Sequence, residues 1–446
     1  MRVAHGFHLT YCTNTHPGET WPAVWTNVQR YLPELKQSLS PNQPFGIGLR
    51  LADVASLALL KDGQLAAFKA WLRAENLYVF TLNGFPYGSF HHQVVKDRVY
   101  APDWSTVERL AYTRRLVQIL AELLPEGMEG SISTLPLSYK PWFSGPEALE
   151  RVFRSSTIAL ISLVIDLVKL QAETGKLIHL GLEPEPDGLL ENTQEVIAFF
   201  EYWLLLLGSA ALGQQLGISN DRAEQHIRNH IRVCYDTCHF AVEYEEPARA
   251  LSHLQEAGIG ISKVQLSSAV RIAIPAALTE RQAILQRLHP FAESTYLHQV
   301  IARQSDGTLK QYRDLEQALP EFLTTDAAEW RTHFHVPIFL QDYPLLQSTQ
   351  DHLIATLAYL QAFPICNHLE IETYTWDVLP AAIKFDLTHS IQREYDWVLQ
   401  QLRIPSAGPN RISHSPQPET YSPRGLSVAV SGRCSRETQR FHIAAP

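Results

Sequence analysis

The residues best suited to chemistry stand where a short apolar run ends, in the segment 232–240. Asp236 closes the run, and His239 follows three residues later, just before the acidic segment 243–246. Hard and borderline divalent metals bind carboxylate oxygen together with imidazole nitrogen, so an Asp-x-x-His pair at a strand end predicts half of a metal site. The alternative is an aspartate that caps a helix, followed by an ordinary surface histidine.

A second pair of acidic residues follows another apolar run. Glu183 and Glu185 alternate with Leu182 and Pro184, so the two carboxylates share one face. They would repel each other unless a cation or hydrogen-bond donors held them. The alternative is a solvated acidic loop.

The last apolar run carries two more glutamates, Glu370 and Glu372, on either side of Ile371. A glutamate inside a buried strand is costly unless it is paired. Glu372 is the nearer to the strand end and is the better candidate. The combined candidates are Glu183, Asp236, His239 and Glu372. This mixture of oxygen and nitrogen donors suits zinc, manganese or a related divalent ion.

The elements that must position these residues alternate between short apolar runs and long amphipathic ones, which is typical of parallel βαβ units. We expect strands over 6–13, 45–51, 77–85, 131–137, 177–183, 231–235, 261–266 and 368–374, with helices over 25–39, 54–75, 106–124, 153–174, 193–216, 248–257 and 350–362. Two further strand-like runs, 296–302 and 332–340, form one late elaboration. Eight strand–helix repeats predict an α/β fold, a closed (β/α)8 TIM barrel, whose active site lies at the carboxyl ends of the strands. An open doubly wound sheet is the alternative, but no Gly-rich phosphate turn follows the first strand.

The chain divides at about residue 404. Residues 1–403 carry the barrel pattern, whereas 404–446 are rich in Ser, Pro and Arg without apolar periodicity. We expect one barrel domain followed by a disordered tail.

Composition restricts the class of protein. The 446 residues are 45% hydrophobic and carry a formal net charge of -9, which disfavours a surface built for nucleic acid. The five cysteines contain no CxxC pair, as expected of reduced thiols in a cytoplasm. We expect no signal peptide and no membrane insertion, because the most apolar run, 203–213, is too short to span a bilayer.

The segment 233–241 closely resembles the sixth-strand motif of endonuclease IV, and the glutamate positions fit the wider xylose isomerase-like TIM barrel superfamily. The resemblance implies that Glu183, Asp236, His239 and Glu372 bind metal. Gln265 stands where endonuclease IV has a histidine ligand, so the resemblance assigns it to the metal as well, and glutamine there resembles the sugar isomerase and epimerase branch. The resemblance also assigns to the metal the further histidines His298 and His335.

Four phrases resemble the EboE "metabolite traffic" family: 8–14 with 16–19, 182–186, 333–337 and 370–376. That resemblance implies a cytoplasmic protein that works with partner proteins of the same operon. It also implies a role in the processing or export of a secondary-metabolite precursor of the scytonemin type. The tail does not resemble the family.

The preferred hypothesis is a metal-dependent isomerase or epimerase acting on a small sugar-like or polyol metabolite. The metal would polarise a carbonyl, and Glu183 or Glu372 would move the proton. Candidate substrate-binding residues are His8, His16, Phe85, Glu185 and Trp376. The alternatives are a metal-dependent phosphodiesterase of the endonuclease IV type and a non-catalytic metabolite-binding or trafficking protein.

Overall fold

The computed structural model describes residues 1–380, 384 and 386–403, so the predicted tail, 404–446, lies outside the described residues. Eight parallel strands follow one another around a barrel in the order β1-β14-β7-β6-β5-β4-β3-β2. Their bounds are β1 His8–Tyr11, β2 Phe45–Arg50, β3 Leu77–Asn83, β4 Gly130–Thr134, β5 Ile178–Leu182, β6 Ile231–Asp236, β7 Ile261–Leu266 and β14 His368–Ile371. A parallel bridge between Cys12 and Gly48 joins β1 to β2 and closes the ring. The predicted (β/α)8 barrel is therefore confirmed.

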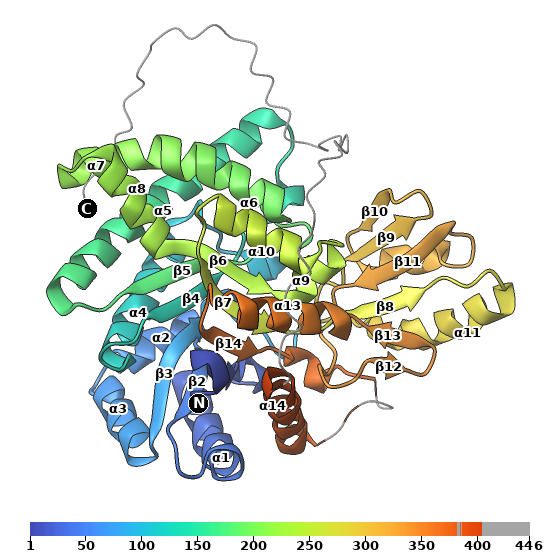
Figure 1. The fold of residues 1–446 in the computed structure, drawn as a ribbon, viewed down its shortest axis with the longest axis horizontal. Helices are drawn as coiled ribbons and strands as arrows, with labels where there is room; N and C mark the ends of the chain where they lie inside the picture. Colours follow the sequence, from blue (N-terminus) through green and yellow to red (C-terminus); the bar gives the residue numbers. More distant parts are fainter. Residues whose placement is uncertain (381–383, 385, 404–446) are drawn as a thin grey trace, which may run out of the picture.

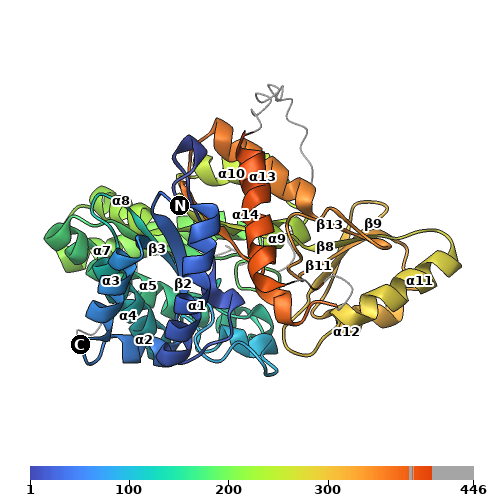
Figure 2. The ribbon, with the colours of Figure 1, turned by 90° about the horizontal axis from the view of Figure 1, so that it is seen from below.

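Helices surround the barrel because each has one apolar face to bury (Figure 1). In α1, for example, the buried residues recur at helical spacing from Trp21 to Leu35. The outer helices are α1 Trp21–Leu39, α2 Asp53–Leu59, α3 Gln64–Ala74, α4 Val107–Leu123, α5 Pro146–Thr174, α6 Thr193–Phe199, α7 Ser209–Leu216, α8 Asn220–His230, α10 Pro247–Glu256, α13 Gln350–Ala362 and α14 Leu387–Arg403. The last of these packs between α13 and α1, so the ends of the described chain meet on one side (Figure 2).

Two helical predictions change in detail. The helix expected over 54–75 is interrupted, because Gly63 takes a left-handed conformation with φ of 73° and starts α3 afresh. The helix expected over 193–216 is continuous but contains a π-helical stretch, Phe200–Gly208, between α6 and α7. By length and composition this helix could cross a membrane, yet 56% of its most apolar window is buried inside the protein, as in a core helix.

The barrel interior contains a buried ion pair. The Lys263 ammonium contacts the Glu370 carboxylate, and neither side chain is exposed. Burial alone lowers the pKa of Lys263, but the Glu370 charge outweighs it and the pKa of Lys263 is raised. Space for Glu370 depends on Gly48, since a Cβ there would lie 1.9 Å from Glu370 Oε1. This layer is the floor beneath the carboxyl ends of the strands.

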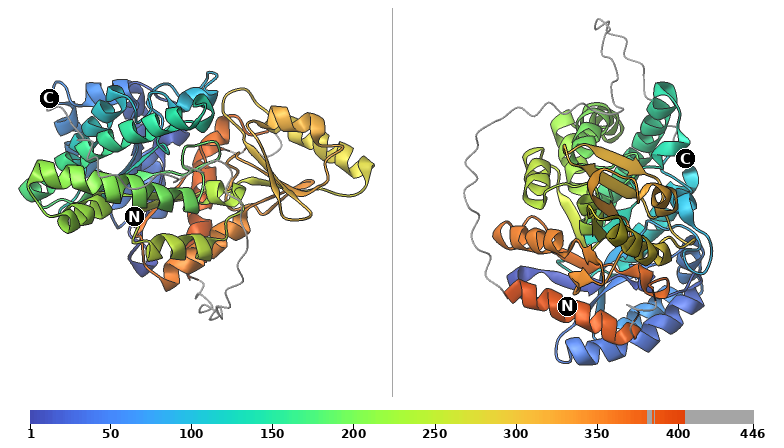
Figure 3. Two further views of the ribbon diagram at one scale, coloured as in Figure 1. Left: turned by 90° about the horizontal axis from the view of Figure 1, so that it is seen from above. Right: turned by 90° about the vertical axis from the view of Figure 1, so that its right-hand side faces the viewer.

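A second sheet is inserted between β7 and β14, and it projects from one side of the barrel (Figure 3). Its strands run in the order β10-β9-β11-β8-β13-β12, with antiparallel pairing throughout. They are β8 Val270–Ala273, β9 Val300–Gln304, β10 Leu309–Tyr312, β11 Ala327–Thr332, β12 Asp342–Tyr343 and β13 Leu346–Ser348, accompanied by α11 Leu278–Leu288 and α12 Leu315–Ala318. The insertion follows the carboxyl end of β7, so it stands beside the mouth of the barrel.

The structure corrects the prediction of strands in the two late runs, 296–302 and 332–340. The run 296–302 supplies only the first residues of β9. The run 332–340 is not a strand, because β11 ends at Thr332, whose carbonyl accepts a bond from the Phe334 amide in a tight turn, and Pro337 has no N–H to donate. Its residues instead form an irregular segment that crosses the barrel mouth.

Candidate metal centre

Three strand ends bring one carboxylate each to the same point of the mouth. Glu183 follows β5 directly, Asp236 is the last residue of β6, and Glu372 follows β14. One oxygen from each lies within 4.8 Å of the other two, and the side chains are at most 4% exposed. Glu183 Oε2 and Asp236 Oδ2 are buried without a hydrogen-bond partner. The Glu372 carboxylate is held by the side-chain amides of Asn14 and Asn83, at 2.8 and 2.7 Å.

Asp236 does two things at once. Its Oδ1 accepts bonds from the amides of Cys238 and His239, at 2.8 and 3.2 Å, and so caps the short helix α9, Thr237–Val242. The Ser267 hydroxyl donates to the same oxygen at 2.5 Å. The capping interpretation is therefore correct for Oδ1, while Oδ2 is left without a hydrogen-bond partner. His239 is not a surface histidine, since it is 3% exposed.

Three imidazoles approach the carboxylates from α9 and from the segment after β11. Each Nδ1 faces an acceptor oxygen: Pro184 O at 3.1 Å for His239, Gln299 Oε1 at 2.9 Å for His333, and Glu372 O at 2.5 Å for His335. The Nε2 atoms of His333 and His335 are buried and have no partner. An imidazole whose Nδ1–H is tied to an oxygen presents the lone pair of Nε2, which is the arrangement found around ligating histidines.

Burial dominates the electrostatics of this cluster. Burial, and then Asp236 and Glu185, raise the pKa of Glu183 well above its usual value. Burial, and then Glu183 and Asp236, do the same to the pKa of Glu372. Burial also lowers the pKa values of His239, His333 and His335, so these imidazoles are neutral near pH 7, which is the ligating form.

The residues fit a divalent cation. The ion-pair contacts of the three carboxylates in the described part of the chain are two long ones, from Glu183 and Asp236 to His239, at 3.9 Å each. Buried carboxylates this close together are stable as anions only beside a positive charge. Further groups of donors overlap the first: Asp236, His239 and His335 form one, and Glu185, His239 and His333 another. Mixed oxygen and nitrogen donors suit zinc, manganese or a related ion.

A pocket of about 560 Å³ opens above the cluster. Its lining includes Glu183, Glu185, Glu372 and the three histidines, and it also carries an aromatic wall of Phe85, Phe90, Tyr100, Tyr296 and Tyr374. The rings of Phe90, Tyr296 and Tyr374 contact one another, with centroids 4.9 to 5.3 Å apart. Lys96 is the one ammonium or guanidinium group among the described lining residues, and its Nζ lies 2.6 Å from Asp314 Oδ2. The pocket is therefore acidic at its base and aromatic at its side.

Two of the predicted ligands have their donor atoms occupied. Gln265 pairs in register with Asp236, but its amide oxygen accepts from the Cys234 thiol at 3.0 Å, and its buried Nε2 has no partner. His298 Nδ1 lies 3.1 Å from the His333 carbonyl, and Nε2 lies 2.8 Å from the Glu293 carboxylate. His298 thus has no free ring nitrogen and holds the crossing segment in place, so we remove it from the ligand set.

Three of the predicted substrate-binding residues lie away from the pocket. His8 begins β1 and therefore lies at the opposite end of the barrel, where Nδ1 is 2.9 Å from the Tyr78 hydroxyl. His16 bonds to the Tyr11 hydroxyl at 2.8 Å and stacks on Tyr31. Trp376 is buried in the apolar core of the inserted sheet. Phe85 and Glu185, the other two, do line the pocket.

The sequence did not single out several residues of the site. Asn83 is the last residue of β3, and Asn14 follows β1 within a short 3-10 turn, Thr13–Thr15. A search for amides at strand ends would have found Asn83, because the carboxyl ends of barrel strands point to one mouth. Tyr100 ends a short 3-10 helix, Lys96–Tyr100, and Tyr296 precedes β9. Nothing in their sequence context predicts that they line the pocket.

Comparison with known proteins gives solved structures of low similarity. No protein-family model and no curated protein matches the sequence. Among the solved structures, the IolI protein with a bound zinc atom is 11% identical, with 89% of this chain and 98% of that chain covered at a TM-score of 0.45. A xylose isomerase-like TIM barrel protein from Mycobacterium smegmatis in complex with magnesium is 12% identical, with coverage of 90% and 98% and a TM-score of 0.46. A xylose isomerase domain protein from Planctomyces limnophilus is 14% identical, with coverage of 83% and 91% and a TM-score of 0.41.

Proposed function

We propose that this protein is a divalent-metal-dependent enzyme of the isomerase or epimerase type, acting on a small, uncharged sugar-like or polyol metabolite. The observation that carries the proposal is the meeting of Glu183, Asp236 and Glu372 with neutral imidazoles at the base of a pocket. Buried donor atoms without partners cost free energy that a bound cation would offset. In TIM barrels the active site lies at the carboxyl ends of the strands, so a metal bound at this mouth is well placed for catalysis.

In this proposal the cation is held by Glu183, Asp236, His239 and Glu372. A cation bound there supplies a Lewis acid that polarises a carbonyl or hydroxyl oxygen of the substrate. Asn14 and Asn83 fix the Glu372 carboxylate through its Oε1, which suits a residue that must keep one orientation.

Glu183 and Glu372 are the candidate groups for proton transfer, and their surroundings differ. Glu372 is tied by two amides, whereas Glu183 Oε2 is free of hydrogen bonds and belongs to the pocket lining. A proton acceptor needs an oxygen that is free to reach the substrate carbon. Glu183 can hold the cation through one oxygen and keep the other for the substrate, so Glu183 is the better base, and Glu372, fixed by two amides, serves as a ligand alone. Glu185, with Oε1 unpartnered on the same pocket, is positioned to accept a hydrogen bond from a substrate hydroxyl.

The charge of the pocket favours an uncharged substrate. Four carboxylates approach it, and a divalent cation leaves the site with a negative balance. Lys96 is already paired with Asp314, so a phosphate group would find no available cationic side chain among the described lining residues. This argues against the phosphodiesterase alternative, which needs groups that hold a phosphate backbone. The aromatic wall offers an apolar surface for the C–H face of a ring.

We further propose a cellular role in metabolite traffic, which rests on the resemblance to the EboE family. The four phrases that carry the resemblance supply Asn14, Glu183, Glu185, His335 and Glu372 to one pocket. The proposed context is the processing or export of a secondary-metabolite precursor of the scytonemin type, in the cytoplasm and with partner proteins from the same operon.

The test is proton exchange at carbon. Chelated protein reloaded with manganese or zinc is incubated in deuterium oxide with neutral aldoses, ketoses and cyclic polyols, and with their phosphate esters, and deuterium incorporation is followed by NMR. We expect incorporation into an uncharged compound, lost in Glu183→Gln and retained in a surface control, Glu122→Gln. Binding of a compound without exchange, in fully loaded protein, would instead identify a carrier.

A further inference from the structure

Lys96 is the one ammonium or guanidinium group among the described residues that line the pocket, and the fold holds it there. Lys96 begins its short 3-10 helix with a φ of 44°, a backbone conformation that residues other than glycine rarely adopt. Its amide and that of Val95 both donate to the Thr295 carbonyl, at 3.0 and 2.7 Å. These two bonds join a loop of the barrel to the segment that precedes β9, so the position of the lysine is set by the backbone.

Asp314 neutralises this lysine. Its Oδ2 lies 2.6 Å from Lys96 Nζ, and the Lys96 and Asp314 side chains are 22% and 9% exposed. The Glu293 carbonyl accepts from the same ammonium at 3.3 Å. Asp314 belongs to the inserted sheet, between β10 and α12, and is 218 residues away from Lys96 in the chain. The pairing therefore exists only because the insertion stands beside the barrel mouth.

The Asp314 carboxylate does not serve its own helix. Asp314 is the N-cap residue of α12, where an aspartate commonly accepts bonds from helix amides, yet its side chain accepts none of them. Its Oδ1 is buried and has no hydrogen-bond partner. Among the described residues, the hydrogen bond found for this carboxylate is the one to Lys96. The carboxylate is thus directed at the pocket.

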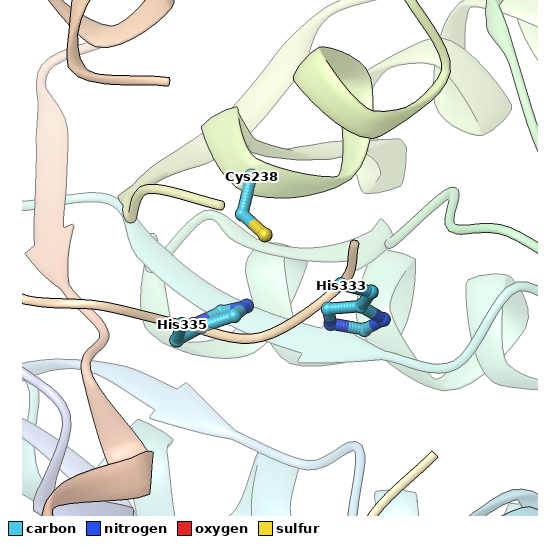
Figure 4. Close-up of side chains that lie close together, drawn as sticks. All are labelled: Cys238, His333 and His335. Atoms are coloured by element: carbon cyan, nitrogen blue, oxygen red, sulfur yellow. The ribbon is translucent and has the colours of Figure 1, made fainter. Parts of the chain in front are cut away.

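The imidazoles of the pocket add no positive charge. Figure 4 shows His333 and His335 on the crossing segment, together with Cys238 of α9. Burial lowers the pKa values of these two imidazoles and of His239, so all three are neutral near pH 7. Lys96 is therefore the cationic side chain that a negatively charged ligand would use in the described part of the pocket.

We propose that Asp314 is a specificity-determining residue that acts through Lys96: it neutralises the ammonium and so excludes phosphorylated compounds in favour of uncharged ones. A free ammonium is a good partner for phosphate, whereas a paired one offers no net charge. A site can select one ligand by withholding a contact from its competitor, and Asp314 withholds Lys96. The assignment rests on the proposed function, since it names the substrate class that the same pocket admits.

The test compares four metal-loaded, full-length proteins that differ only in the charges of this pair, with inorganic phosphate as the probe in calorimetric titrations. Asp314→Asn keeps an oxygen that can accept from Lys96 but removes the negative charge, so phosphate should bind about 10-fold more tightly than to the parent. Lys96→Met leaves Asp314 unpaired and should bind phosphate more weakly than the parent. The double variant removes both charges and should return to the parent affinity.

A purely structural role gives a different pattern. If Lys96 and Asp314 only tie the barrel loop to the inserted sheet, the two single variants and the double variant loosen the same contact and change phosphate affinity in the same direction. A gain that is kept in the double variant, or no gain in folded Asp314→Asn, would overturn the proposal. The gain should also shrink between about 0.01 and 1 M salt, because the screening length falls from about 30 to 3 Å.

Two further variants serve as controls. Glu321→Gln makes the same chemical change in an exposed ion pair, Lys310 with Glu321, and should leave phosphate affinity unchanged. Asp314→Ser removes the same charge with a different side chain and should reproduce the gain, and circular dichroism checks that each variant is folded.

The deuterium-exchange assay separates this assignment from the proposed function. Preference of the unaltered protein for a phosphate ester over the matching uncharged compound would overturn the role of Asp314. Absence of exchange with every compound would count against the proposed function, while the phosphate titrations would still decide the role of Asp314.

Discussion

Replacing Asp236 by asparagine separates its two roles. Oδ1 caps α9 and accepts from Ser267, while Oδ2 is buried without a partner, and one oxygen of the group lies within 4.8 Å of oxygens of Glu183 and Glu372. Asparagine keeps an oxygen at the capping position, since it caps helices as well as aspartate. It puts an NH₂ group where Oδ2 was, and that group can donate to the neighbouring carboxylates. We therefore expect Asp236→Asn to fold well and to bind metal poorly.

The magnitudes follow from the contacts. Asp236→Ala loses the cap, at about 0.5 to 2 kcal/mol, and leaves the buried Ser267 hydroxyl without its acceptor, at about 1 to 3 kcal/mol. A loss of about 1.5 to 5 kcal/mol is therefore expected. Asp236→Asn avoids both losses and removes one of three converging charges, so metal-free protein should be at least as stable as the parent. Loss of an outer-shell partner weakens metal binding by about 10- to 100-fold, and loss of a direct ligand should cost at least as much.

Two measurements check this pair of variants. Urea unfolding of chelated protein gives stability, and calorimetric titration with zinc or manganese gives affinity. If Asp236→Asn binds metal as tightly as the parent, Asp236 is only a cap. If Asp236→Ala is as stable as the parent, the hydrogen bonds to Oδ1 do not contribute to the free energy of unfolding.

Three further outcomes follow from the structure. Lys263→Met should lower the free energy of unfolding, measured by urea titration, by about 3 to 5 kcal/mol because it leaves Glu370 buried without its partner. Adding Glu370→Leu should recover most of that loss, and no recovery would contradict the pairing. Burial raises the pKa of Glu394 to about 8, above its ordinary 4.5, so this carboxyl is protonated in the folded protein and stability should fall as pH rises between the two values. At about 1.4 kcal/mol per unit, Glu394→Gln should remove up to about 4 kcal/mol of difference between pH 5 and pH 8, and parallel curves for the two proteins would refute this. Asn83→Ala frees one side of the Glu372 carboxylate and should weaken metal affinity by about 10- to 100-fold in calorimetric titrations, an effect absent if that amide is only structural.

The barrel could be predicted from the sequence because each strand carries its own signal. A short apolar run between amphipathic helices identifies a buried parallel strand, and 261–266 coincides with β7. The inserted sheet could not be predicted in the same way. Its central strand β11 pairs with β8 and β9, and these antiparallel pairings join segments far apart in the chain that have no common local pattern.

The candidate site was predictable from the residues themselves mainly where a residue ends a strand or follows it within three positions. Glu183, Asp236 and Glu372 converge because the carboxyl ends of all eight strands meet at the mouth. His335 reaches the site from an irregular segment whose course depends on a bond between the Val336 amide and Ser268 O. His8 was misplaced for a related reason: it belongs to a barrel strand but to the wrong end of it.

The metal centre can be tested by measuring the metal content of the protein. Purified full-length protein is stripped with a chelator, reloaded with zinc or manganese, desalted and analysed by mass spectrometry beside Glu372→Gln and Asp236→Asn. The structure predicts at least one tightly bound ion per chain in the parent and a reduced content in both variants, with all three proteins folded. A folded parent that retains neither zinc nor manganese would contradict the metal centre, and the pocket would then belong to a metal-free carrier.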